Sequence, residues 1–264
     1  MAYVIDRFGA TYGAGVVLPT LDGRQPQGAG AVDSSQVKLP GGGAFDWRGA
    51  SDALPEVETV RVRGVWKAAD PTAMETKLAA LKALCGQRSY LWQSNGSAQR
   101  SRLARCLEVS SDLEAGFAAD ALIEMVFELA ATPWAGTARN VSQSLDASPK
   151  SYTLTNGGNA RVRDVVITVV AATSNITQIY VVRSGLVELR WQGTITPGSS
   201  LVIDTGARSV KLNGADAYAG LSLQGGHIIA DWLRLDPGDN TVLISRTGGG
   251  TTSTGAFVYA DGHR

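Results

Sequence analysis

Side chains that could act as catalytic bases are scarce in this sequence of 264 residues. Its two histidines are His227, beside a strand-like pattern, and His263, next to the C-terminus. Nucleophilic catalysis needs a base beside a serine or cysteine, and the sequence has no nucleophile-elbow, phosphate-loop or zinc-helix motif. Cys85 and Cys106 have no histidine or cysteine at metal-ligand spacing. We therefore predict no enzyme and no catalytic, metal or cofactor site, and we expect both cysteines to be buried, reduced thiols.

Two carboxylates beside a tryptophan keep sugar chemistry open. Asp231 and Asp236 flank Trp232, and a pair of carboxyl groups is what glycoside hydrolysis requires. However, Asp236 is followed by proline and glycine, which favours a turn, and Asp231 alternates with apolar residues as it would in a strand. Trp191 and Trp232 could stack on sugar rings, but a tryptophan inside a strand pattern is more often a core residue. A carbohydrate-binding protein and a sugar-acting enzyme remain as alternatives.

Arginines gather at Arg61 and Arg63, and again at Arg100, Arg102 and Arg105. The acidic residues in their neighbourhood are Glu56, Glu58 and Glu108. Their presence favours a strand surface with ion pairs, facing solvent or another subunit, over a nucleic-acid patch. Lysines plus arginines number 24, and aspartates plus glutamates also number 24. Because tight binding to nucleic acid or to an anionic membrane normally needs a basic excess, we exclude both.

The first half of the chain predicts strands and one helix that would position these side chains. Val57–Trp66 alternates apolar and charged residues, which is typical of a half-exposed strand. Asp70-Pro71 supplies an N-cap and a first helical residue. The apolar stripe of that helix is Met74, Leu78, Leu81 and Cys85, and Gly86 ends it. Further strands are expected at Tyr3–Arg7, Ser89–Gln93, Arg100–Val109 and Ala121–Leu129, and a long polar loop at Leu21–Ser35.

The sequence changes character near residue 145. Residues 1–145 contain seven glutamates and both cysteines, whereas residues 146–264 contain one glutamate, Glu188. In this second half, short apolar runs recur at strand spacing and are separated by turn clusters such as Asp236-Pro237-Gly238-Asp239-Asn240. The predicted strands are Tyr152–Thr155, Val162–Val170, Ile176–Val182, Leu186–Trp191, Leu201–Asp204, Val210–Leu212, Ala219–Leu223, Ile228–Leu233, Thr241–Ser245 and Ala256–Tyr259. This pattern predicts an antiparallel β-sandwich.

The length of the chain favours two separate cores. Ala138–Lys150 contains Ser, Asn, Asp and Pro with few apolar residues, so it is expected to be the link between them. We therefore expect domains at residues 1–145 and 146–264. Asp6 and Arg7 stand where a signal peptide would have its apolar core, and charged residues interrupt the longest apolar stretch, Ala115–Ala131. We expect a soluble protein made in the cytoplasm, without membrane insertion.

A series of segments resembles one known family by its order and spacing. In the first half these segments are Leu39-Pro40-Gly41-Gly42-Gly43-Ala44-Phe45-Asp46, the strand that ends at Val65-Trp66, Glu75–Gln87 with Arg88-Ser89-Tyr90-Leu91-Trp92, Arg102–Val109, and Ile123 to Pro133-Trp134. In the second half they are Asn156-Gly157-Gly158-Asn159-Ala160, Leu201-Val202-Ile203-Asp204 and Leu235-Asp236-Pro237-Gly238-Asp239-Asn240-Thr241. Together they cover most of the chain and are similar to the siphophage distal tail proteins.

The resemblance implies a mainly β fold. Residues 1–145 would form a tail-tube-like β-barrel or sandwich with one flanking α-helix, and residues 146–264 a galectin-like antiparallel β-sandwich. It also implies a structural virion protein at the distal end of a bacteriophage tail. There the protein would form a hexameric ring that joins the tail tube to the baseplate or adhesion apparatus, with a lumen for DNA.

The partners implied by the resemblance are further copies of the chain, the tail tube protein, the tail-tip hub or tail-associated protein, and receptor-binding proteins. DNA would be present only in transit. A formal net charge of +0 suits a conduit through which DNA slides, and an acidic strand face at Glu124 and Glu128 could line the lumen or face solvent. A carbohydrate-binding host-recognition protein of the tail is the alternative.

Overall fold

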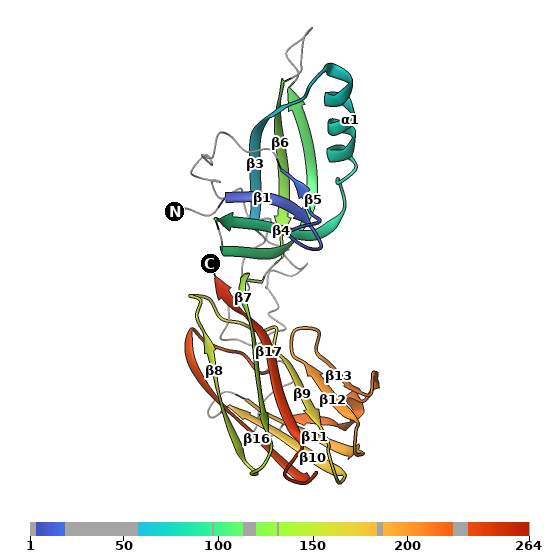
Figure 1. Cartoon of the computed structure of the whole chain (residues 1–264), viewed down its shortest axis with the longest axis vertical. Coiled ribbons are helices and arrows are strands. Elements are labelled where there is room, and N and C mark those ends of the chain that lie inside the picture. Colours follow the sequence, from blue (N-terminus) through green and yellow to red (C-terminus); the bar gives the residue numbers. More distant parts are fainter. Residues whose placement is uncertain are drawn as a thin grey trace, which may run out of the picture. The chain divides into compact units, whose positions relative to one another are not determined.

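The computed structural model describes residues 4–18, 58–96, 98–112, 120–130, 132–183, 187–223 and 232–263. They fall into two compact units, an N-terminal unit that extends to Trp134 and a C-terminal unit that begins at Ala135 (Figure 1). Both are built mainly from antiparallel strands, which confirms the predicted fold class. The predicted loop Leu21–Ser35 lies outside the described residues. No helix in the described ranges is long and apolar enough to span a membrane.

The N-terminal unit contains one open antiparallel sheet with the strand order β2-β1-β4-β5-β6-β3. Its strands are β1 (Val4–Gly9), β2 (Val16–Val17), β3 (Glu58–Lys67), β4 (Arg88–Asn95), β5 (Ala98–Asp112) and β6 (Asp120–Leu129). The strands predicted from alternation, at Val57–Trp66 and Ala121–Leu129, correspond to β3 and β6. Within the described ranges β2 and β3 are the two edges, so these strands do not close into a barrel.

The long strand β5 joins two parts of this sheet. Its first half pairs with β4, from Ala98 to Arg105, and its second half pairs with β6, from Ala104 to Asp112. The register shifts between Cys106 and Glu108, which marks a β-bulge that bends the strand. In Figure 1, β1 and β4 consequently cross the direction of β3 and β6.

The helix α1 (Pro71–Lys82) begins where the sequence predicts. The Asp70 carboxylate accepts a hydrogen bond from the backbone N–H of Ala73 at 2.8 Å, and Pro71 occupies the first turn, where its missing N–H has no helical partner in any case. The apolar stripe Met74, Leu78 and Leu81 is buried in the same core as Ile123, Met125 and Phe127 of β6. The prediction that Cys85 is the fourth member of the stripe is wrong, because the helix ends at Lys82 and the Cys85 side chain is exposed.

The C-terminal unit is a sandwich of two antiparallel sheets, as predicted. The first sheet has the order β14-β13-β12-β9-β17-β7 and contains β7 (Trp134–Ser144), β9 (Val166–Val170), β12 (Ser200–Asp204), β13 (Ser209–Leu212), β14 (Ala215–Asp216) and β17 (Thr254–His263). The second has the order β15-β11-β10-β16-β8 and contains β8 (Lys150–Asn156), β10 (Ile176–Arg183), β11 (Val187–Ile195), β15 (Leu221–Leu223) and β16 (Gly238–Gly248). A short 3₁₀ helix, η1 (Tyr218–Gly220), precedes β15. Buried residues of both sheets form one core, in which the Tyr152 and Phe257 rings lie 4.9 Å apart.

Two sequence-based expectations for this unit are corrected by the structure. Ala138–Lys150 is not an irregular link, because its first seven residues belong to β7 and Leu145 is completely buried. Backbone pairing with β17 fixes this stretch although its side chains are mostly small and polar. The described end of the predicted strand Ile228–Leu233 is also not a strand, although Trp232 and Leu233 are buried. The proposed domain limits 1–145 and 146–264 remain a prediction.

Candidate functional site

The two tryptophans that could stack on sugar rings lie in the core of the C-terminal unit. Trp191 on β11 is 2% exposed and its indole N–H donates to the carbonyl of Ala217 at 3.1 Å. Trp232 is 7% exposed and its ring lies 6.3 Å from that of Tyr218. Because neither ring offers a face to solvent, the carbohydrate-binding hypothesis loses the residues on which it rested.

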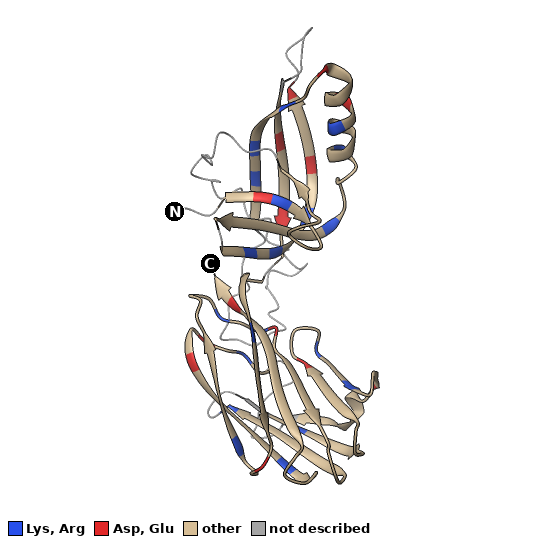
Figure 2. Ribbon diagram, in the orientation of Figure 1, with Lys and Arg blue, Asp and Glu red and all other residues tan. Residues whose placement is uncertain are grey.

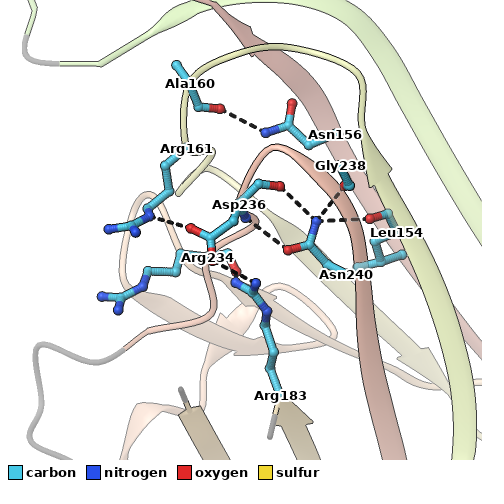
Figure 3. A network of polar contacts seen from close by, with 9 residues as sticks. All are labelled: Leu154, Asn156, Ala160, Arg161, Arg183, Arg234, Asp236, Gly238 and Asn240. Atoms are coloured by element: carbon cyan, nitrogen blue, oxygen red, sulfur yellow. Dashed lines mark hydrogen bonds and ion pairs between the residues drawn. The ribbon is translucent and has the colours of Figure 1, made fainter. Parts of the chain in front are cut away.

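The carboxylate pair proposed for sugar hydrolysis is not present as a pair among the described residues. Asp231 lies outside them, as does His227. Asp236 is held by two arginines: Nε of Arg161 donates to its carboxylate at 2.6 Å, and an NH2 group of Arg183 donates at 2.8 Å (Figure 3). Burial raises the pKa of Asp236, but the hydrogen bonds and charges of the two arginines outweigh this and hold the pKa below its usual value. Asp236 is therefore an ionised structural anchor, unsuited to act as an acid.

The turn that contains Asp236 is organised by Asn240. Its amide group donates to the carbonyls of Asp236 and Gly238, both at 2.9 Å, and to that of Leu154 at 3.2 Å (Figure 3). Its side-chain oxygen accepts the backbone N–H of Asp236 at 2.9 Å. Asp236 and Pro237 precede β16, with a bend at Pro237, whereas Gly238, Asp239 and Asn240 of the predicted turn cluster already belong to β16. The polar network of Figure 3 therefore has a structural role.

His263 lies at the end of β17 and packs against Gly136 of β7, since a Cβ added at Gly136 would come within 2.5 Å of its Nε2 atom. Across the described ranges, no cluster of three or more His, Cys, Asp or Glu side chains could hold a metal ion.

The cysteines are free and differ in environment. Cys106 on β5 is fully buried, as expected, and burial raises its pKa to about 12, with a smaller contribution from Cys85. Cys85 is exposed, so the prediction of a second buried thiol is wrong. The buried position next to it belongs to Leu84, which is 7% exposed. Leu84, and not the predicted Cys85, is therefore the buried residue that follows Leu81.

The arginines predicted to form ion pairs on a strand surface do so, with a different partner. Arg61 donates to Glu124 at 3.1 Å, and Nε of Arg63 donates to the other oxygen of the same carboxylate at 2.6 Å. Figure 2 shows these basic residues of β3 beside the acidic residues of β6. The hydrogen bond from Arg63 is the main reason that the pKa of Glu124 lies below its usual value.

The face that carries Glu124 and Glu128 is therefore not an acidic face. In the ladder, Glu124 stands opposite Arg63 on β3, and Glu128 stands opposite Arg105 on β5. Arg102, by contrast, is 7% exposed and its Nε donates to the carbonyl of Ala130 at 2.9 Å. The arginines of β5 therefore do not form one exposed group, because Arg102 is buried and Arg105 is exposed.

Apolar side chains also lie on this same face, since both faces of β3 and β6 carry apolar residues. Val65 on β3 and Leu122 on β6 are register partners, and they are 39% and 47% exposed. Leu107, the extra residue in the bulge of β5, is 45% exposed. We define the outer face of the N-terminal sheet as Arg61, Arg63, Val65, Leu107, Leu122 and Glu124. Large apolar side chains exposed on the same sheet face as ion pairs are typical of a surface that another protein covers.

Comparison with known proteins finds a family model that matches part of the C-terminal unit and solved structures that match more of the chain. Residues 157–257 match the family model of the siphovirus-type tail component, C-terminal domain. The crystal structure of the SPP1 Dit (gp 19.1) protein, described as a paradigm of the hub adsorption apparatus in Gram-positive infecting phages, matches with a TM-score of 0.57 and 13% identity over 98% of this chain and 89% of that chain. The phage P2 baseplate in its activated conformation with Ca matches with a TM-score of 0.38 and 9% identity over 76% of this chain and 78% of that chain.

No curated protein sequence matches the chain significantly. The SPP1 Dit match shows the fold, and the family model matches part of the C-terminal unit. Together they confirm the resemblance to the siphophage distal tail proteins.

Proposed function

Since residues 157–257 match the family model of the siphovirus-type tail component, C-terminal domain, we propose that this chain is a structural component of a bacteriophage tail tip. In this proposal six copies form a ring that joins the tail tube to the baseplate or adhesion apparatus. DNA passes through the lumen of the ring, and the chain has no catalytic role.

The observation that carries the ring proposal is the outer face of the N-terminal sheet. It combines three large apolar side chains, each about two fifths exposed or more, with a carboxylate held by two arginines. Burying such side chains stabilises an interface by about 25 cal/mol for each Å² of apolar surface. A head-to-tail contact between copies must either close into a ring or continue as a fibre, and the family resemblance favours closure with six copies.

The charge distribution supports a lumen through which DNA slides. Lysines plus arginines and aspartates plus glutamates both number 24, so the chain carries no basic excess. Phosphates held by a basic surface would resist movement, because each contact adds affinity. A chain without a basic excess reduces that retention.

The C-terminal unit is proposed to face the adhesion proteins. Its core is complete within itself, because apolar residues of both sheets pack into one buried cluster. It can therefore present its loops to a hub or receptor-binding protein without rearranging. The carbohydrate-binding alternative has no supporting observation, because both candidate tryptophans are buried.

Negative-stain electron microscopy of the purified full-length chain, with light scattering for mass, tests this function. We expect rings with a central hole and the mass of six copies. A monomer at tens of micromolar, with no rings on the grid, would overturn the proposal.

A further inference from the structure

The chain's two cysteines are brought together where β4 and β5 begin to pair. Gly86, which follows Cys85, has a φ of +82°, a left-handed conformation that glycine adopts without strain. Its N–H donates to the carbonyl of Cys106 at 2.8 Å, and the N–H of Cys106 donates to the carbonyl of Gln87 at 3.0 Å. Two residues thus oppose one, which is the pattern of a glycine β-bulge. This backbone clamp fixes Cys85 beside Cys106.

The two thiols lie close together but differ in access to solvent. Backbone hydrogen bonds of Gly86 and Gln87 to Cys106 place Cys85 beside it, and the proximity of Cys85 contributes to the raised pKa of Cys106. Cys106 is completely buried and also lies 3.9 Å from the carbonyl oxygen of Glu108, whereas Cys85 is exposed. A small disulfide reagent can therefore reach the sulfur of Cys85 and not that of Cys106.

We propose that Cys85 and Cys106 form a thiol–disulfide exchange pair, in which exposed Cys85 reacts first with a low-molecular-weight disulfide and buried Cys106 then closes an intramolecular disulfide. Cys106 is buried in the core of the N-terminal unit, so this modification site does not depend on ring formation. Its product would link the segment after α1 covalently to β5.

The reaction balances as two successive exchanges. The Cys85 thiol loses its proton and attacks one sulfur of the small disulfide, which breaks the S–S bond and releases one thiolate. The Cys106 thiol then loses its proton and attacks the Cys85 sulfur, which releases the second thiolate. The two released thiolates take up the two protons, so the protein is oxidised by two electrons and the reagent is reduced by two.

Burial makes the second exchange the slow one. Because the pKa of Cys106 is raised to about 12 by desolvation, little of its thiolate is present at neutral pH. The proximity of Cys85 compensates, since the attack is intramolecular and needs no encounter.

Oxidised glutathione tests this site in the full-length, fully reduced chain. After incubation and denaturation in acid, we expect the protein to have lost the mass of two hydrogen atoms, with no free thiol. Reduction by dithiothreitol should restore both thiols. A lasting glutathione adduct with one free thiol, a disulfide-linked dimer, or two unmodified thiols would each overturn the proposal.

Two variants assign the roles of the sulfurs. Cys106→Ala should accumulate the glutathione adduct on Cys85, because nothing resolves the mixed disulfide. Cys85→Ser changes an exposed side chain and should leave Cys106 unmodified in the folded chain. Rapid modification of Cys106 in the Cys85→Ser variant would show that burial does not impose the order of attack and would overturn the mechanism.

Discussion

Arg139 on β7 and Asp261 on β17 form an ion pair of unequal burial within the C-terminal unit. The NH2 group of Arg139 donates to the carboxylate of Asp261 at 2.8 Å, and its Nε contacts the two carboxylate oxygens at 3.2 and 3.3 Å. The backbone N–H of Gly157 donates to the same carboxylate at 2.9 Å. Asp261 is 4% exposed. Burial raises its pKa, but these donors outweigh burial and hold the pKa below its usual value.

Asp261→Asn should therefore reduce the stability of the C-terminal unit. Losing the charge while keeping one acceptor oxygen is expected to cost about 1–2 kcal/mol, measured by urea unfolding at neutral pH. The folded-state pKa lies below the unfolded value of about 3.9, so the wild-type contribution is present above that pH and is lost as the pH falls through the folded pKa. The variant should lose this part of the acid sensitivity.

A matched control is Asp146→Asn, which affects an exposed carboxylate paired with Lys150 at 2.7 Å. An exposed pair of this kind contributes little, so stability should hardly change. Equal unfolding midpoints for wild type and Asp261→Asn would contradict the role given to Asp261.

Asp236→Ala should destabilise the same unit by leaving two arginines without their carboxylate. The side chain of Arg183 is 12% exposed, so its charge would be poorly solvated. We expect a loss of about 2 kcal/mol, below the range for a fully buried pair because Asp236 itself is one third exposed. Urea unfolding measures it, with Asp239→Ala at the start of β16 as the control, since Asp239 is exposed and accepts one hydrogen bond, from the Thr155 hydroxyl at 2.6 Å. A cost no larger than that of the control would show that the network is not stabilising.

Sequence patterns within a single strand or helix, such as alternation and an N-cap, correctly predicted β3, β6 and α1. β3 and β6 were found because charged and apolar residues alternate in them, and α1 because Asp70 and Pro71 define its start. β7 was missed because its stability comes from pairing with β17, more than a hundred residues away, and not from apolar side chains of its own. Cys85 was misplaced because the helix ends at Lys82, where helical spacing no longer applies.

The candidate site was predicted in part for the same reason. The arginines of β3 were expected to form ion pairs. Their partner on β6 depends on the register between two strands about 60 residues apart, and that register cannot be predicted from the composition of either strand. The pairing of Val65 with Leu122 depends on the same register between β3 and β6. A signal was present in each strand, since Val65 precedes Trp66 and Leu122 precedes Ile123, so both faces carry apolar residues there.

The end of α1 provides a direct comparison of neighbouring residues. Leu84→Ala should destabilise the N-terminal unit by about 2 kcal/mol, because it removes a buried side chain. Cys85→Ser, at an exposed position, should change stability by less than about 0.5 kcal/mol. Thermal unfolding under reducing conditions measures both. A larger effect of Cys85→Ser than of Leu84→Ala would restore the sequence-based assignment of Cys85 to the packed stripe.

Limited proteolysis tests the strand assignment of residues 138–144. Trypsin can cut after Arg139, but this residue lies within β7 and is held by Asp261. We expect no early fragment that begins at Asn140, because a paired strand must open before a protease can bind it. The same cut should become faster in Asp261→Asn. An early wild-type fragment starting at Asn140 would instead support a link at this position.

A substitution on the outer face of the N-terminal sheet tests whether this face holds the ring together. Leu122→Lys places a charge opposite Val65, in a patch that the ring proposal buries between copies. The side chain is 47% exposed in the single chain, so a folded monomer tolerates the change, whereas a buried interface does not. We expect the variant to lose its rings in electron micrographs and to scatter light as a monomer, with an unchanged circular dichroism spectrum. Val258→Lys on β17, at an apolar position 43% exposed in the other unit, is the control and should keep the rings. If wild type forms rings and Leu122→Lys forms them equally well at low micromolar concentration, the ring exists but this face does not hold it together.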